Sequence, residues 1–310
     1  MNLYSEKISF KALGTDIQAE IIFGDASKKE KAESDLESLK DIYFTKQKIF
    51  CRFYGKSELN RLNSNLGSFQ KALPDIVYLA KRALFYNKLS GGMYDPRVIE
   101  ILEKIGYKKD FKKTDFSKME MPENFDEIAT PLSGDLKIRE EKLFFARRMD
   151  FSGIAKGYIT DCAAKFLKSR GWHDFLINSG GDMSIAGKNA EGEKWRIEIE
   201  GVPKEKMMLE ISERGIATSG ISRKKWQIKG KKFHHLVNPK DPNSYSYEIR
   251  TVSVIAKNTE NADGRAKTLV LMGKERGMNF AEKNGIAAVF LDYKGGIFIT
   301  PESKKYLAST

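Results

Sequence analysis

The spacing of apolar residues along the chain predicts several amphipathic helices. In residues 28–47, Leu36, Leu39 and Ile42 recur at helical intervals and would share one face of a helix. Similar spacing predicts further helices over residues 75–89, 160–170, 262–272 and 274–283.

Alternating apolar positions and β-branched residues predict strands, most of them in the second half of the chain. The predicted strands cover residues 16–23, 174–178, 194–199, 207–211, 233–237, 251–256, 287–291 and 297–300. Several follow one another without an intervening helix, which favours mixed or antiparallel sheets over a doubly wound parallel sheet. We therefore expect an α+β fold with helices flanking the sheets. Because the sequence has no repeat, low-complexity tract or Pro/Gly-rich linker, residues 1–310 are expected to form a single domain.

Composition is that of an ordinary globular protein. The 310 residues are 41% hydrophobic and 31% charged, which disfavours disordered and membrane-spanning classes. The net charge is +12, but lysines are spread among acidic residues along the whole length. Short basic clusters at 223–225 and 229–232 are therefore expected to be solvated surface and not a nucleic-acid site. Attraction of an anionic ligand such as a dinucleotide is a second interpretation.

The beginning of the chain has neither the apolar run of a secretory signal nor a nearby cysteine for lipid attachment. No apolar run approaches the roughly 20 residues of a spanning helix. Cys51 and Cys162 form neither a ligand cluster nor a disulfide framework. We expect a cytoplasmic location without stable membrane insertion, or export if a leader has been removed.

The densest chemical signal lies in residues 150–158, which lead into a predicted helix. Small residues allow a ligand to approach the main chain, a helix start offers free N–H groups, and Lys156 adds a positive charge. These features predict a cradle for phosphate or pyrophosphate. The segment lacks the Gly-Lys-Ser/Thr order of a Walker loop, and taken alone it also fits a plain capped connection.

Four other segments carry weaker signals. Residues 177–182 are a strand that ends in two glycines and an acid, and residues 89–96 join a helix end to a glycine pair and an aromatic-acid pair. Residues 217–220 precede the His234–His235 pair; neighbouring strand residues point to opposite faces, so only one of these two histidines can face a ligand. In residues 261–267, Asp263 and Lys267 lie four apart, as in a simple intrahelical ion pair.

In order and spacing, these segments resemble the successive motifs of the ApbE-like family over nearly the whole chain. The matching segments are residues 13–15, 52–63, 91–96, 150–161, 178–182, 218–220, 234–235 and 262–263. Members of that family bind FAD, split its pyrophosphate with Mg²⁺, and attach FMN to a threonine hydroxyl of an acceptor flavoprotein with release of AMP. The resemblance therefore implies an FAD:protein FMN transferase.

The resemblance also assigns residues to roles. The residues implied in FAD binding are Leu13, Phe53, Met93, Tyr94, Asp95, Asp150, Lys156, Ser219, His235 and Leu236. The Gly153 carbonyl and the Asp263 carboxylate would bind Mg²⁺. Lys156 would steady charge on the phosphates, and either Asp263 or His235 would take the threonine proton.

Lys267 departs from the family pattern at the metal site. The family usually has Thr or Asp at this position, whereas a charged ammonium cannot ligate Mg²⁺. In residues 238–242, Asn238 also stands where the family usually has an aspartate, so a carboxylate is missing there. Three alternatives stay open: a working transferase, an FAD-binding protein with weak or no activity in which a Lys267–Asp263 ion pair replaces the metal, and an FAD pyrophosphatase. We favour the transferase, with an acceptor flavoprotein as partner and no nucleic acid; the oligomeric state is open.

Overall fold

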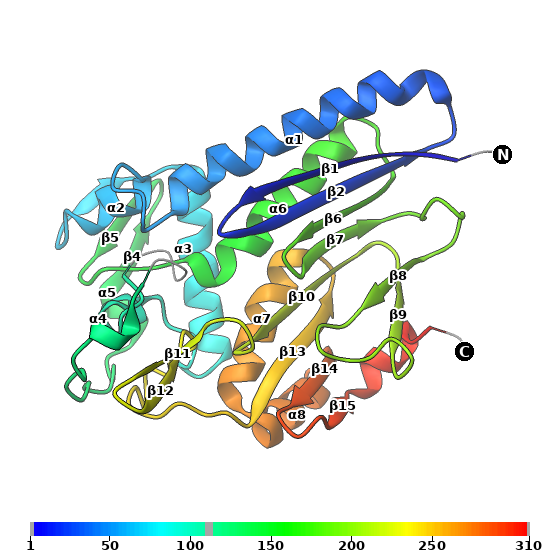
Figure 1. Cartoon of the computed structure of the whole chain (residues 1–310). Helices are drawn as coiled ribbons and strands as arrows, with labels where there is room; N and C mark the ends of the chain where they lie inside the picture. Colours follow the sequence, from blue (N-terminus) through cyan, green and yellow to red (C-terminus); the bar gives the residue numbers. More distant parts are fainter. Residues whose placement is uncertain (1–2, 109–113, 309–310) are drawn as a thin grey trace.

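An eight-stranded antiparallel sheet runs through the middle of the molecule (Figure 1). The computed structural model describes residues 3–108 and 114–308. The strands lie in the order β1-β2-β6-β7-β10-β13-β14-β15. Their bounds are β1 (Tyr4–Ala12), β2 (Thr15–Phe23), β6 (Asp174–Ser179), β7 (Asp182–Ala186), β10 (Arg214–Gly220), β13 (Ile249–Ala256), β14 (Ala287–Asp292) and β15 (Ile297–Ile299). The expected α+β fold is confirmed.

Four long helices cover one face of this sheet (Figure 1). They are α1 (Lys29–Phe50), α6 (Ser152–Ser169), α7 (Thr259–Met272) and α8 (Lys274–Lys283). Alternation along the strands separates the two faces: in β13, Val252 and Val254 pack on the α7 side, whereas Ile255 belongs to the opposite core. The opposite core is closed by the hairpin of β8 (Trp195–Glu198) and β9 (Met208–Ile211).

Further helices, turns and small sheets surround one end of the helical layer. The helices are α2 (Glu58–Asn63), α3 (Pro74–Leu89), α4 (Ile99–Lys104) and α5 (Leu132–Asp135). The 3₁₀ turns are η1 (Ala26–Lys28), η2 (Pro96–Val98), η4 (Phe116–Lys118) and η5 (Pro301–Tyr306). The small sheets are β3 (Phe69–Lys71), β5 (Lys142–Phe145) and β4 (Leu136–Arg139), and the pair β11 (Lys225–Ile228) and β12 (Lys231–His234).

Three boundaries differ from the prediction in ways that affect the site. Helix α6 begins at Ser152 and not at 160, so the expected phosphate loop forms the first turns of the helix. Helix α7 begins at Thr259 and not at 262, so Asp263 lies one turn inside the helix and not at its start. Strand β12 ends at His234, so His235 lies beyond the strand. The strands that were not predicted are β1, β3, β4, β5, β7, β10 and β11.

Across the part of the chain that the structure describes, no helix combines the length and the apolar character needed to cross a membrane.

Candidate active site

Helices α6 and α7 approach each other closely because Gly157 has no side chain. A Cβ atom at Gly157 would lie 2.8 Å from both the Cα of Glu260 and the carbonyl oxygen of Thr259. The start of α7 is held by Asp161, whose carboxylate accepts hydrogen bonds from Thr259 N at 2.8 Å and Glu260 N at 2.9 Å. The close contact between α6 and α7 therefore fixes the positions of the side chains that lie where the two helices cross.

Four charged side chains meet at this crossing, and we call Lys156, Asp182, Asp263 and Lys267 the four-charge cluster. Lys156 Nζ lies 2.8 Å from Asp182 Oδ2. Asp263 Oδ2 accepts a hydrogen bond from Gly157 N at 3.2 Å. Lys267 Nζ lies 4.0 Å from Asp263 Oδ1. Two carboxylates and two ammonium groups thus share one largely buried region.

The charges in the cluster shift one another's pKa values. Burial, followed by the neighbouring Asp182, raises the pKa of Asp263. Burial by itself would lower the pKa of Lys156, but Asp182 and Asp263 outweigh it and raise that pKa. Burial lowers the pKa of Lys267, although Asp263 and Asp182 oppose the shift.

Asp182 reaches the cluster from a tight hairpin between β6 and β7. Gly180 and Gly181 form the turn with φ values of +64° and +102°, which favour glycine. A Cβ at Gly180 would lie 2.1 Å from Thr15 Oγ1, so this hairpin packs against the β1–β2 turn that contains Leu13. The strand signal in residues 177–182 therefore ends at a residue of the four-charge cluster, although the sequence did not identify Asp182 as part of a site.

Tyr94 closes the cluster from the loop after α3. A Cβ at Gly153 would lie 3.1 Å from Tyr94 Cε2 and 3.2 Å from Lys267 Nζ, so these two side chains flank Gly153. The Tyr94 hydroxyl is buried and has no hydrogen-bond partner within residues 3–108 and 114–308. Burial, then the charges of Asp150 and Asp263, raise the Tyr94 pKa well above its usual value.

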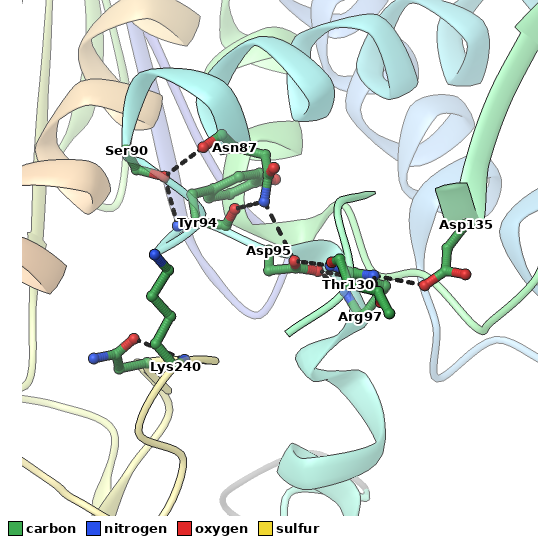
Figure 2. Close-up of polar contacts among 9 residues, drawn as sticks. Asn87, Ser90, Tyr94, Asp95, Arg97, Thr130, Asp135 and Lys240 are labelled. Carbon is green, nitrogen blue, oxygen red and sulfur yellow. Dashed lines mark hydrogen bonds and ion pairs between the residues drawn. The ribbon is translucent and has the colours of Figure 1, made fainter. Parts of the chain in front are cut away.

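Asp95, the residue after Tyr94, is held by protein contacts (Figure 2). Arg97 donates from Nε to Asp95 Oδ1 at 2.9 Å and from Nη2 to Oδ2 at 2.7 Å. Asn87 Nδ2 donates to the Tyr94 carbonyl at 2.9 Å and fixes the same loop. The half-buried Met93 packs at the edge of the α7 core. The expected contacts of Asp95 and Met93 with FAD stay predictions.

Phe53 and Asp150 are linked through Arg52. The Arg52 guanidinium lies 4.4 Å from the Phe53 ring centroid, and its Nε lies 3.2 Å from Asp150 Oδ2. Asp150 Oδ1 also accepts a hydrogen bond from Ser152 N at 2.8 Å, at the start of α6. Phe53 is 45% exposed, which leaves an aromatic surface open to a ligand.

The two histidines occupy different environments. His234 is buried, and its Nε2 lies 3.1 Å from the carbonyl oxygen of Ser246. His235 is half-buried, and burial together with the ammonium groups of Lys224 and Lys267 lowers its pKa. His235 is therefore the histidine whose environment includes the four-charge cluster.

Three further predicted residues lie at the periphery of this arrangement. Leu13 has φ +54° in the β1–β2 turn and donates its backbone N–H to Gln47. Ser219 is buried in β10, and Leu236 is buried just after His235. Their expected contacts with FAD stay predictions.

The residues around Gly153 do not fit the Mg²⁺ coordination that the resemblance implies. Mg²⁺ requires a near-octahedral set of oxygen ligands at about 2.0–2.1 Å. Lys267 Nζ instead donates a hydrogen bond to the Gly153 carbonyl at 2.7 Å and lies beside Asp263. Among the described residues, no group of three or more His, Cys, Asp and Glu side chains is arranged to hold a metal ion. The positive charge at this position comes from an ammonium group.

Comparison with known proteins identifies the family. A model of the ApbE family matches residues 13–290.

The chain belongs to the ApbE family.

This ApbE-family chain is 25% identical over 314 aligned positions to an FAD:protein FMN transferase of Haemophilus influenzae, covering 96% of this chain and 90% of that protein. It is 35% identical over 147 positions to a Vibrio cholerae protein of the same name, covering 46% of this chain and 44% of that protein. The crystal structure of the Pseudomonas stutzeri flavinyl transferase ApbE has a TM-score of 0.81 at 22% identity, covering 99% of both chains. The Thermotoga maritima ApbE protein has a TM-score of 0.83 at 18% identity, covering 99% of this chain and 100% of that one.

Proposed function

We propose that this protein is an FAD:protein FMN transferase. The observation that carries the proposal is the four-charge cluster at the first turns of α6, in a chain that matches the ApbE family over residues 13–290. Lys156 and Lys267 supply two ammonium groups where a helix begins, an arrangement suited to a pyrophosphate. Because Tyr94 from the first half of the chain lies against Gly153 and closes a cluster whose four residues come from the second half, we further propose that residues 1–310 act as one catalytic unit.

We propose that FAD lies between the cluster and the exposed face of Phe53. Its pyrophosphate would contact Lys156, and an aromatic ring of the dinucleotide would stack on Phe53. The remaining residues proposed to line the ligand are Leu13, Met93, Tyr94, Asp95, Asp150, Ser219, His235 and Leu236. The unpartnered Tyr94 hydroxyl supports this placement because a buried hydroxyl normally has a partner.

The proposed reaction transfers a phosphoryl group without redox change. The acceptor threonine oxygen forms a bond to the phosphorus of the FMN half. The bond from that phosphorus to the bridging oxygen breaks, and the bridging oxygen leaves with AMP. The threonine proton passes to Asp263 or His235, the two acceptors at the cluster. Lys156 neutralises charge that develops on the phosphate oxygens.

The test uses FAD, the full-length protein and a flavoprotein that carries an acceptor threonine. We expect the intact mass of the acceptor to rise by one FMN while AMP appears in equal amount. An acceptor with Thr→Ala at the target position is the control and should stay unmodified. AMP with free FMN and no labelled acceptor would indicate a pyrophosphatase instead, and FAD binding without AMP release would contradict the enzyme proposal.

Two variants distinguish the proposed bases. Asp263→Asn and His235→Gln both remove a proton acceptor, but only loss of the true base should lower the transfer rate with little change in FAD affinity. The acceptor flavoprotein itself and the cytoplasmic location stay predictions.

A further inference from the structure

We infer that the Lys267 ammonium takes the place of a divalent cation beside the FAD pyrophosphate, so that this chain binds and cleaves FAD without Mg²⁺. The inference rests on the proposed function and concerns the same site. It departs from the metal requirement that the family resemblance implies.

The first argument is position. Lys267 Nζ donates to the Gly153 carbonyl at 2.7 Å and lies 4.0 Å from Asp263 Oδ1. These are the two groups that the resemblance assigns to the metal. The ammonium therefore occupies the space between both expected ligands.

The second argument is fit. The Lys267 side chain is only 17% exposed and reaches across from α7 to the first turn of α6. A Cβ at Gly153 would lie 3.2 Å from Lys267 Nζ and 3.3 Å from its Cδ, and 3.1 Å from the Tyr94 ring. Because Gly153 has no side chain, the Lys267 side chain fits beside it, and the ammonium is enclosed between Gly153 and its neighbours.

The third argument is charge. Lys156 and Lys267 match Asp182 and Asp263 in number, so the four-charge cluster has no net charge when all four groups are ionised. A dication beside Lys267 would lie within a few ångströms of an ammonium and be repelled by it. A diphosphate, by contrast, would be attracted by both lysines.

The fourth argument is hydrogen-bonding capacity. An ammonium group has three N–H donors. One of them is used by the Gly153 carbonyl, and Asp263 Oδ1 at 4.0 Å is beyond hydrogen-bond distance. No other acceptor is found for Lys267 Nζ in the described parts of the chain, so two donors are available for phosphate oxygens.

The experiment measures FAD affinity by quenching of flavin fluorescence, in EDTA and in excess Mg²⁺. For the wild-type chain we expect the same Kd in both buffers. Lys267→Thr removes the ammonium and supplies an oxygen ligand. In EDTA its affinity should fall roughly 10- to 100-fold, the effect of losing a charge-assisted hydrogen bond, and Mg²⁺ should restore it.

Two further variants serve as controls. Lys267→Met removes the charge without supplying a ligand, so its affinity should fall and Mg²⁺ should not restore it. Arg265→Thr removes a charge from the same helix, at a residue that lines a separate surface groove with Arg214 and Lys257. Its affinity should match that of the wild type in both buffers.

Direct metal uptake separates this inference from the proposed function. Mn²⁺ binding, followed by electron paramagnetic resonance, should be absent in the wild type with or without FAD and present in Lys267→Thr. If wild-type FAD binding requires Mg²⁺, or if the wild type takes up Mn²⁺ at the site, the inference is overturned while the transferase proposal stands. If the wild type binds no FAD in either buffer, the proposed function fails, and Mn²⁺ uptake alone still decides the role of Lys267.

Discussion

Two buried ion networks lie next to Tyr94. They differ in how many of their polar groups have hydrogen-bond partners. The first, which we call the Asp95–Arg97 network, consists of Asn87, Asp95, Arg97, Thr130 and Asp135 (Figure 2). Both Asp95 oxygens accept hydrogen bonds, and Arg97 also donates to Asp135 and Thr130. The second is the four-charge cluster. There, Asp182 Oδ1 has no hydrogen-bond partner in the described residues, and Oδ2 is paired only with the Lys156 ammonium, 2.8 Å away.

The difference indicates separate roles. A buried network whose donors and acceptors are paired within the protein stabilises the chain and leaves few polar groups free for a ligand. A buried network with spare donors and acceptors carries a desolvation cost that a bound ligand can relieve. The Asp95–Arg97 network therefore supports the loop, in keeping with the proposal that the four-charge cluster binds the substrate.

Breaking the Asp95–Arg97 network should have the largest effect on stability. Arg97→Met would leave Asp95 and the partly buried Asp135 without their cation, and we expect a loss of about 3–5 kcal/mol in the free energy of unfolding. Urea unfolding measures it. Arg148→Met is the control, because Arg148 pairs with Glu103 at 34% exposure and should cost less than about 1 kcal/mol. Equal losses in both variants would contradict the comparison.

Breaking the four-charge cluster should instead affect activity. Lys156→Met removes the ammonium proposed to contact the pyrophosphate, and we expect FMN transfer to fall about 100-fold. The unfolding free energy should fall less than in Arg97→Met, because one carboxylate loses its cation instead of two. The rate is followed by AMP release. Lys168→Met, on an exposed part of the same helix, should leave the rate unchanged. A stability loss as large as that of Arg97→Met would place Lys156 among the structural residues.

The sequence predicted the α+β class, the five longest helices and about half of the strands, because apolar periodicity follows burial. It failed at the start of α6, since Gly153 and Gly157 are poor helix formers. Glycine is needed at both positions because neighbouring groups come very close: Gly157 lies against the α7 backbone, and Gly153 lies against Lys267 and Tyr94. The start of α6 is therefore determined by tertiary packing, which the helix propensities of the individual residues do not show.

The candidate site could be predicted in part. The family motifs pointed to Lys156, Asp263 and Lys267, which the structure brings together. Asp182 was missed because its ion pair with Lys156 spans 26 positions and depends on the β6–β7 hairpin meeting α6. The sequence also could not predict where the Lys267 side chain points, because its hydrogen bond to the Gly153 carbonyl joins residues 114 positions apart.

His234 tests whether a buried polar group with a partner behaves as a structural residue. Burial lowers its pKa to about 4, so between about pH 6.5 and pH 4 the unfolded chain binds a proton that the folded chain does not. The contribution of His234 to stability is therefore complete above about pH 6.5 and is lost as the pH falls toward 4, by up to about 2–3 kcal/mol. Urea unfolding across this range should show a shallower pH slope for His234→Gln than for the wild type. An identical slope would mean that His234 does not account for the effect.

The smallest change in stability is expected for Asp182→Asn, although Asp182 is among the most buried charges of the cluster. Its Oδ1 has no hydrogen-bond partner in the described residues and its Oδ2 is paired only with Lys156, so the variant removes a desolvated charge together with one ion pair, and these effects oppose each other. We expect the unfolding free energy to change by less than about 1 kcal/mol, with a lower transfer rate because Lys156 loses the group that positions it. Asp95→Asn is the matched control: the same substitution in the fully bonded network should cost clearly more stability. If Asp182→Asn proves the more destabilising of the two, the four-charge cluster is a structural network. In that case, polar groups without hydrogen-bond partners do not mark the substrate site.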